Sequence, residues 1–326
     1  MSISKDIEVI PAHIWTPHFG LLGSISGFDS VKDCFKEYEK NIHALETGLS
    51  SDPEMNWRLS KLDKYTLISN SDAHSFWPWR LGRECNVLEI KEKNEISYKS
   101  IIESIKNKKG FLETIEVDPN YGKYHLDGHR NCEVCLTPEE SLKNKKKCPK
   151  CGKDLTLGVL YRVEQLADRE LGYKPKTAVP FRRLIPLHEI ISAVIGLGVS
   201  SQKAWIEYNK LIKEFGNEMN ILISVEDQKL RSVCSENLAE AIINNRNEKL
   251  KIIPGYDGVY GYPVINGKKG IKEPESLDSR TARNEDSTEQ KSKDDKKDSK
   301  KEEKTESKKS IKNFKQKEIQ KGLGEF

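Results

Sequence analysis

The chain has 326 residues, of which 33% are charged and 36% hydrophobic, with a formal net charge of +4 at pH 7. This composition allows one or two folded domains and indicates that part of the chain stays unfolded, while the net charge alone is too small to indicate a nucleic-acid partner. No apolar run approaches the ~20 residues that span a bilayer, and the first residues lack a signal-peptide core, so we expect a cytoplasmic protein with no membrane partner.

The N-terminal third alternates apolar runs with amphipathic stretches. Period-2 and period-3.6 patterns predict strands at 7–14, 42–47 and 65–70 and helices at 29–41 and 53–61. A helix at 98–109 and a strand at 110–117 follow. Strands that alternate with helices are typical of parallel α/β architecture.

Polar side chains follow the first three predicted strands. His13 and Glu46 end two of them, and LISNSDAH ends the third with Asp72 and His74. Neighbouring parallel strands bring their carboxyl ends together, so these groups can face one metal ion if the backbone curls after Ser71. Carboxylate and imidazole ligands suit a hydrolytic metal site. The alternative is an ordinary turn, because an Asp-x-His pair alone is a weak signal.

Four of the seven cysteines form two close pairs with the spacing C-x2-C-x12-C-x2-C, namely Cys132, Cys135, Cys148 and Cys151. Each pair can place two thiolates on one tetrahedral Zn²⁺, and four cysteine ligands predict a structural zinc. His125 and His129 lie just upstream and could serve as spare ligands. Six lysines in or after the loop form either a solvated surface or a phosphate-binding one: Lys143, Lys145, Lys146, Lys147, Lys150 and Lys153.

Residues 161–250 show mostly helical spacing, and residues 271–326 are almost entirely Lys, Glu, Asp and Ser, which predicts disorder. At the chain end, Gln320, Leu323 and Phe326 have Q-x-x-L-x-x-F spacing. That spacing resembles peptides that dock on a replication sliding clamp, with the charged run as a tether. The alternative is an inert terminus.

Several segments together resemble the endonuclease Q family of the PHP phosphoesterase superfamily. They are PAHIWTPHFGLLGSISGFDS, ALETGLSSDPEMNWRLS, YTLISNSDAH, YHLDGHRNCEVCLTPEE, GVLYRVEQLADR, IPLHEII and PGYDGVYG. The resemblance implies an α/β fold: the C-terminal part of a PHP-type distorted (β/α)7 barrel, a four-cysteine zinc-binding segment, a mostly helical region and a disordered tail. The corresponding ranges are 1–117, 118–160, 161–268 and 269–326.

The resemblance also implies a metal-dependent DNA endonuclease, associated with the nucleoid, that incises damaged DNA 5′ to uracil, hypoxanthine or abasic sites. His13 matches a histidine ligand of the barrel, and Asp72 and His74 match its closing Asp-x-His motif, while Glu46 matches less securely. Zn²⁺, Mn²⁺ or Mg²⁺ would be the catalytic ions. Ser50 and Asn70 lie where a flipped-out base could be read by hydrogen bonds.

One departure from the family pattern leaves the activity open. The PHP barrel begins with a His-x-His strand, and this chain contains no His-x-His. We therefore expect the first half of the barrel and about half of the metal ligands to lie outside this chain, as in an N-terminally truncated member. The alternative is a non-catalytic, zinc-containing DNA-binding fragment, and a small-molecule phosphoesterase is less favoured because it needs no zinc segment.

Overall fold

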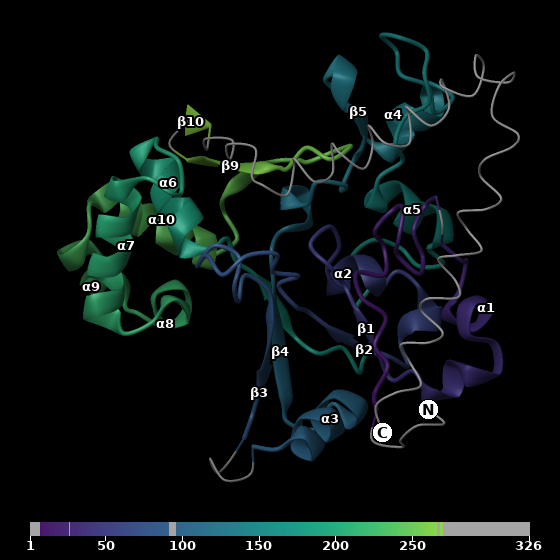
Figure 1. The fold of residues 1–326 in the computed structure, drawn as a ribbon, viewed down its shortest axis with the longest axis horizontal. Helices are drawn as coiled ribbons and strands as arrows, with labels where there is room; N and C mark the ends of the chain where they lie inside the picture. Colours follow the sequence, from purple (N-terminus) through teal and green to yellow (C-terminus); the bar gives the residue numbers. More distant parts are fainter. Residues whose placement is uncertain (1–6, 26, 91–95, 266–267, 270–326) are drawn as a thin grey trace, which may run out of the picture. The chain divides into compact units, whose positions relative to one another are not determined.

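The computed structural model describes residues 7–25, 27–90, 96–265 and 268–269, which belong to one compact unit, Met1–Glu273 (Figure 1). The strands are β1 (Ala44–Glu46), β2 (Thr66–Ile68), β3 (Cys85–Leu88), β4 (Phe111–Glu116), β5 (Asp127–His129), β6 (Val134–Leu136), β7 (Phe181–Arg183), β8 (Lys251–Ile253), β9 (Tyr262–Ile265) and β10 (Lys268–Lys269). The α-helices are α1 (Val31–Phe35), α2 (Pro53–Asn56), α3 (Tyr98–Asn107), α4 (Pro138–Lys143), α5 (Val159–Leu166), α6 (Leu187–Ile195), α7 (Gln202–Phe215), α8 (Glu218–Ile223), α9 (Asp227–Val233) and α10 (Glu236–Arg246). The short 3-10 helices are η1 (Lys36–Asn41), η2 (Ser60–Leu62), η4 (Pro119–Tyr121) and η5 (Arg130–Cys132).

The first two strands pair in parallel, as the alternating pattern predicted. Ala44 lies opposite Thr66 and Glu46 opposite Ile68, so the carboxyl ends of β1 and β2 are neighbours. A separate sheet has the order β3-β4-β7, with β3 antiparallel and β7 parallel to β4. The described strands thus form a mixed α/β fold, and the barrel stays a prediction.

The predicted strand at 7–14 is wrong, because the described residues there have no regular pairing. Pro11 has no N–H to donate, and His13 has a positive φ of 31°, which interrupts an extended chain. The segment nevertheless lies along β1. The Glu46 N–H donates to the Pro11 carbonyl at 3.0 Å, and the Ile14 N–H donates to the Glu46 carbonyl at 3.1 Å.

The predicted helix at 29–41 is divided. Ser30 caps α1 by accepting from the Asp33 N–H, and the helix ends at Phe35, because the φ of 51° at the next residue, Lys36, is incompatible with continuing it. The remainder is η1. The predicted helix at 53–61 likewise splits into α2, capped by Asp52, and η2. The strands at 42–47, 65–70 and 110–117 and the helix at 98–109 are confirmed with slightly shorter bounds.

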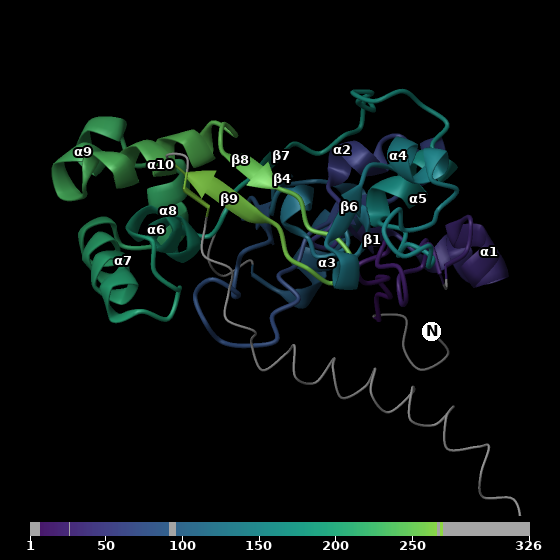
Figure 2. The same cartoon turned by 90° about the horizontal axis from the view of Figure 1, so that it is seen from above.

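The region after 161 is mostly helical, as predicted, and α6 to α10 gather in one group in both views (Figures 1 and 2). Their shared core includes Leu187, Ile191 and Leu211 and extends to Ile115 of β4. The core therefore joins the helices to the three-stranded sheet. None of the described helices is long and apolar enough to cross a membrane.

Arg183, at the end of β7, joins elements from three parts of the chain. Its guanidinium pairs with Asp52 at 2.5 Å, Glu54 at 2.8 Å and Glu248 at 3.1 Å. This network connects the start of α2 to the segment after α10. Of the predicted disordered tail, 269–326, only Lys269 lies within the described residues, so the tail and the clamp-like end with Gln320 stay predictions.

Candidate metal and nucleic-acid site

A series of hydrogen bonds connects the C-terminal ends of β1 and β2. Glu46 ends β1 and is 7% exposed. Its Oε2 accepts from the His13 backbone N–H at 2.6 Å, and its Oε1 accepts from the Asn70 Nδ2 group at 2.7 Å. The Asn70 Oδ1 in turn accepts from the Asn86 Nδ2 group at 3.4 Å. The structure therefore brings His13, Glu46 and Asn70 together, and Asn70 orients Glu46.

His13 lies close to the turn that follows β1. A Cβ atom at Gly48 would come within 2.7 Å of the His13 Cβ, and Gly48 itself has a φ of 75°. Both facts require glycine there. The His13 Nδ1 is buried and has no hydrogen-bond partner among the described residues. A buried imidazole nitrogen without a partner is chemically suited to a metal ion or to a ligand that donates a hydrogen bond.

Asp72 and His74 lie on a loop that closes on itself. The chain curls after Ser71, as the sequence required, because Asp72 has a φ of 43° and its Oδ1 lies 3.4 Å from the His74 Nε2. The Ser71 hydroxyl accepts from the Gly82 N–H at 2.8 Å and donates to the Glu84 carbonyl at 3.0 Å. The side chains of Asp72 and His74 are about half and two-thirds exposed, so both are open to ligands.

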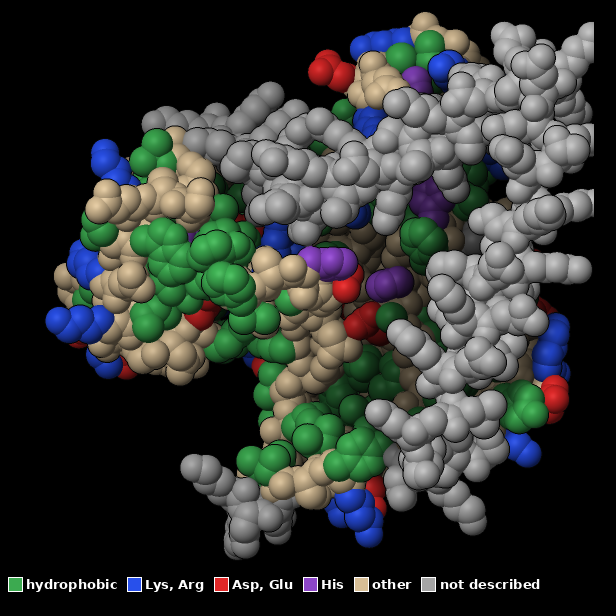
Figure 3. All heavy atoms as spheres, in the orientation of Figure 1, with side chains coloured by type: hydrophobic (Ala, Val, Ile, Leu, Met, Phe, Trp, Pro, Cys, Tyr) green, Lys and Arg blue, Asp and Glu red, His purple; other side chains and the backbone are tan. Residues whose placement is uncertain are grey.

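The four predicted ligands of the catalytic cluster do not form a complete metal site by themselves. Among the described residues, a group of three or more His, Cys, Asp or Glu ligand atoms close enough to share an ion occurs only in the zinc segment. Histidine and acidic side chains do appear side by side in the middle of one face (Figure 3). The arrangement therefore offers two partial sites, His13 with Glu46 and Asp72 with His74.

Behind these strand ends lies a buried carboxyl group that sequence reasoning missed. Glu116 ends β4 with 0% exposure, and its Oε2 accepts from the hydroxyls of Thr47 at 3.1 Å and Ser69 at 2.9 Å. Burial raises the pKa of Glu116 to about 7. Because Thr47 follows Glu46 and Ser69 precedes Asn70, this one carboxyl holds the ends of β1 and β2 against β4. Its signal in the sequence was a fourth polar strand end, TIEVD, at the end of the predicted strand at 110–117.

A second buried carboxyl lies beside the first. Glu84 is 1% exposed, and burial together with the neighbouring Glu116 raises its pKa. Its Oε1 accepts from the Val117 N–H at 3.1 Å, whereas its Oε2 has no hydrogen-bond partner among the described residues. The strand ends thus rest on a layer of carboxyl groups that favour the neutral form.

A small pocket, partly open to solvent, lies next to Ser50. Its lining residues are Leu49, Arg83, Val117, Tyr121, Gly122, Pro186, Glu189 and Tyr260. Ser50 packs behind it, because a Cβ at Gly122 would lie 2.2 Å from the Ser50 Oγ. Arg83 connects the pocket to the Asp72 loop by donating from Nε to the Ser71 carbonyl at 3.0 Å.

The zinc segment forms a compact ligand group. His129, Cys132, Cys148 and Cys151 each offer one ligand atom, and these atoms lie within 4.8 Å of one another. Tetrahedral Zn²⁺ with bonds near 2.3 Å keeps its ligand atoms about 3.8 Å apart, so three sulfurs and one imidazole nitrogen at this spacing can hold a metal ion. Burial alone would raise the pKa of Cys148, but the N–H groups of Cys151 and Lys150 lower it to about 6.

Cys135 was predicted to be the fourth ligand, but the group of four close ligand atoms contains His129 and not Cys135. Cys135 pairs with Gly128 in the β5–β6 ladder, next to the pair formed by His129 and Val134. Successive residues of a strand point to opposite faces, so Cys135 and His129 face apart. Burial also raises the pKa of the Cys135 thiol to about 11. The signal for His129 was its own three-residue spacing from Cys132.

The lysines of the zinc segment mostly have local partners. Lys143 pairs with Glu139 at 2.8 Å and Lys147 with Asp154 at 2.6 Å. Lys150 donates to the Cys132 carbonyl at 2.7 Å. These contacts leave the ammonium groups at the surface, where exposed ion pairs are weak and can be exchanged for phosphate contacts.

Comparison with known protein families and curated proteins gives three matches. The family described as "MJ0043 C-terminal domain" matches residues 186–249. The uncharacterized protein MJ0043 of Methanocaldococcus jannaschii is 38% identical over 236 residues, 72% of this chain and 29% of the relative. The uncharacterized protein YqxK of Bacillus subtilis is 32% identical over 256 residues, 77% of this chain and 59% of the relative.

Two solved structures share the fold. The lesion-specific endonuclease PfuEndoQ from Pyrococcus furiosus matches with a TM-score of 0.70 and 35% identity, covering 84% of this chain and 65% of that one. Endonuclease Q in complex with a 27-mer duplex substrate, which carries an abasic lesion at the active site, matches with a TM-score of 0.70 and 37% identity, covering 82% and 63%. The chain spans less than two thirds of the length of each of these relatives.

Proposed function

The chain belongs to the endonuclease Q family, and from this premise we propose that it acts on damaged DNA as a metal-dependent endonuclease. Incision falls 5′ to uracil, hypoxanthine or an abasic site. The observation that carries the proposal is the meeting of His13, Glu46 and Asn70 at the ends of parallel strands, on the strand pair that also leads to Asp72. His13, Glu46, Asp72 and His74 would hold the catalytic ions, with the remaining ligands supplied from outside the described residues.

Divalent ions bound at such a site would lower the pKa of a water molecule and offset phosphoryl charge. The protein's own groups would orient the ligands and hold the strand ends together. Asn70 holds the Glu46 carboxylate by one oxygen, and Glu116 ties Thr47 to Ser69 beneath it. Ligands held this way keep their geometry when a charged phosphodiester arrives.

The pocket near Ser50 supports the recognition of a deaminated base. The pocket is small and partly open to solvent, so the polar side chains of its lining, and not its size, are what suit the edge of a base. Uracil and hypoxanthine present a carbonyl oxygen next to a ring N–H, the reverse of cytosine and adenine. Arg83 can donate to the carbonyl and Glu189 can accept from the N–H, with Ser50 and Asn70 as the further candidates for base contacts.

The zinc segment would hold one structural Zn²⁺ through three thiolates and His129. Such a closed ligand set stabilises the segment and leaves no open position for catalysis. At the other end of the chain, Gln320, Leu323 and Phe326 would dock on a sliding clamp. The zinc segment would then serve as a DNA-binding module, and the chain end would bind a replication partner.

The test is incision of duplexes that contain uracil, hypoxanthine or an abasic site, with Mn²⁺ or Mg²⁺ added. The expected result is a nick 5′ to the lesion that disappears in Asp72→Ala, while the thermal unfolding temperature is unchanged because Asp72 is half exposed. Arg83→Met should incise a uracil duplex less efficiently and leave abasic-site incision nearly unchanged, since an abasic site has no base to read.

The second candidate is a zinc-containing DNA-binding fragment without catalysis. It is favoured by the incomplete ligand set of the strand-end cluster among the described residues. Binding of lesion duplexes without incision under either metal would support this candidate and contradict the nuclease. Lack of binding to any DNA would contradict both.

A further inference from the structure

Two neighbouring aromatic side chains stand open to solvent directly after the Asp72–His74 motif. Phe76 is 74% exposed and Trp77 is 40% exposed, and their ring centroids lie 4.7 Å apart at an interplanar angle of 34°. We call this pair the aromatic step. Single exposed apolar residues are ordinary, but a joined pair of large rings at the surface of a folded unit marks an interaction site.

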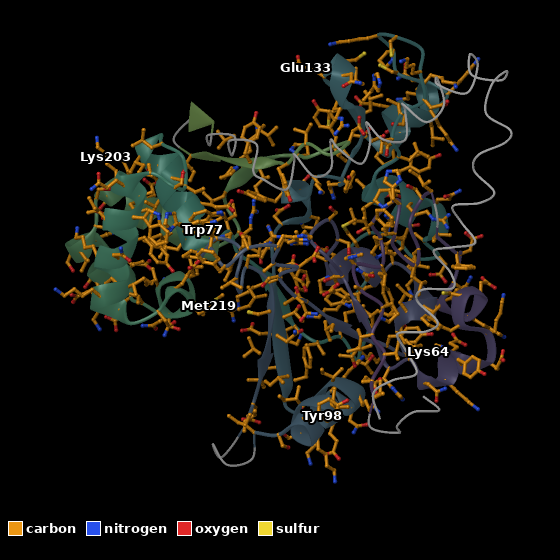
Figure 4. The ribbon with its side chains drawn as sticks, viewed as in Figure 1. Lys64, Trp77, Tyr98, Glu133, Lys203 and Met219 are labelled. Carbon is orange, nitrogen blue, oxygen red and sulfur yellow. The ribbon has the colours of Figure 1, made fainter. Side chains whose placement is uncertain are left out.

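The aromatic step is supported from below by buried rings. Trp77 stacks on Trp79 with centroids 5.3 Å apart and an interplanar angle of 2°. Trp79 is 5% exposed and packs against His188 of α6, at 4.9 Å, and Trp205 of α7, at 6.1 Å. Figure 4 shows Trp77 beside these helices. Pro78 stiffens the backbone between the two tryptophans. The rings are therefore presented in one orientation, and binding requires little further ordering.

The aromatic step shares one closed loop with the candidate metal ligands. Ser71 closes the loop through the Gly82 N–H and the Glu84 carbonyl. Asp72, His74 and the aromatic step all lie between these two ends. The candidate ligands and the rings therefore lie within five positions of one another on one loop.

The charges of the same loop favour a nucleic acid as the occupant. Arg80 and Arg83 follow the aromatic step and are only 7% and 9% exposed; the Arg80 guanidinium lies 5.8 Å from the centre of the Tyr260 ring. Exposed flat rings bind unpaired bases by stacking on them, and the two arginines that follow the rings give the loop a positive charge that favours a polyanion over an uncharged partner. Every base has such a face, so this contact carries no sequence preference.

On these grounds, and resting on the proposed function, we propose that the aromatic step stacks on the nucleobase that loses its neighbour when the damaged nucleotide leaves the duplex. Extrusion of one nucleotide opens a gap in the base stack. Phe76 and Trp77 take the place of the missing base and keep the gap open while the phosphodiester lies at the strand-end cluster. The contact is absent in undamaged duplex, which offers no free base face.

The test compares the affinity of the full chain for an abasic-site duplex and for the matched undamaged duplex, by fluorescence anisotropy without added divalent ions. Trp77→Ala and Phe76→Ala should each weaken binding to the abasic-site duplex roughly tenfold and leave binding to undamaged duplex within about twofold. Trp77→Phe should retain most of the affinity. Trp77→Leu keeps apolar bulk without a flat ring and should lose as much as Trp77→Ala.

The matched control is Tyr38→Ala, which removes an aromatic side chain of η1 that is 59% exposed and should change neither affinity. A fluorescent 2-aminopurine placed directly next to the abasic site in the same strand should be quenched by the unaltered chain and not by Trp77→Leu. Equal affinities for the unaltered chain and Trp77→Ala overturn the stacking role alone. Full affinity in Trp77→Leu also overturns it, in favour of apolar contact with a protein or lipid. If the unaltered chain binds neither duplex, the proposed function fails with it.

Discussion

At the scale of single residues, Glu116 shows how one buried group connects stability to the candidate site. Its carboxyl accepts from Thr47, Ser69 and Thr114, which lie on or beside three different strands. Burial raises the pKa of Glu116 to about 7. The folded state therefore holds this proton more tightly than the unfolded chain does, and stability gained from the protonated form is present below pH 4.5 and lost as the pH rises through 7.

Replacing Glu116 by glutamine keeps the shape and removes this titration. As the pH rises from 5 to 8, we expect the free energy of unfolding of the unaltered chain to decrease by up to about 3 kcal/mol more than that of Glu116→Gln. Chemical denaturation at a series of pH values measures the difference. Glu214→Gln, an exposed carboxyl on α7, is the control and should follow the unaltered chain within about 0.5 kcal/mol. Parallel pH profiles for the Glu116 variant and the unaltered chain would contradict the prediction.

At the scale of elements, the β5–β6 hairpin decides which side chains can share a zinc ion. The cysteine spacing predicted a four-cysteine site, but the pleat turns Cys135 away from the face that carries His129. Local spacing names the candidate ligands, whereas the strand pairing selects among them. The segment at 7–14 is a second example. The sequence predicted a strand next to β1, and the segment does lie along β1, but it does not form a regular strand.

The zinc set can be tested by substitution. His129→Ala should lower bound zinc from one equivalent to a fraction of it and weaken zinc affinity by at least tenfold, because three thiolates remain with one open position. Cys135→Ser should retain one equivalent. Zinc release to a chromogenic chelator measures both, with far-ultraviolet circular dichroism as the folding control. If Cys135→Ser loses zinc and His129→Ala retains it, the result contradicts the set with His129 and supports the four-cysteine site.

At the scale of the whole molecule, the chain combines a folded unit with a long, charged C-terminal segment whose last residues return to apolar side chains. If the chain end binds a clamp as proposed, the tether would increase the local concentration of the folded unit at that partner. DNA binding and clamp binding should therefore be separable.

The double variant Leu323→Ala, Phe326→Ala tests that separation. It should lose measurable binding to an immobilised sliding clamp at micromolar concentration and keep its affinity for an abasic-site duplex, because the apolar anchors are removed and the folded unit is unchanged. Lys321→Ala, between the anchors, is the control and should bind the clamp nearly as well as the unaltered chain. Equal clamp binding by the double variant and the control would show that the terminus is not the docking element.

The sequence by itself determined the order of most elements, the parallel strand ends that carry Glu46 and lead to Asp72, and the presence of a cysteine segment that could hold a metal ion. These features depend on spacing and periodicity, which are local properties of the chain. Only the tertiary structure decided that His129, and not Cys135, lies among the close candidate zinc ligands, that Glu116 joins three strand ends, and that Trp79 is buried under an exposed aromatic step. These features depend on which face of a strand packs against a distant segment and on which polar groups are desolvated there. Local sequence spacing determines neither of them.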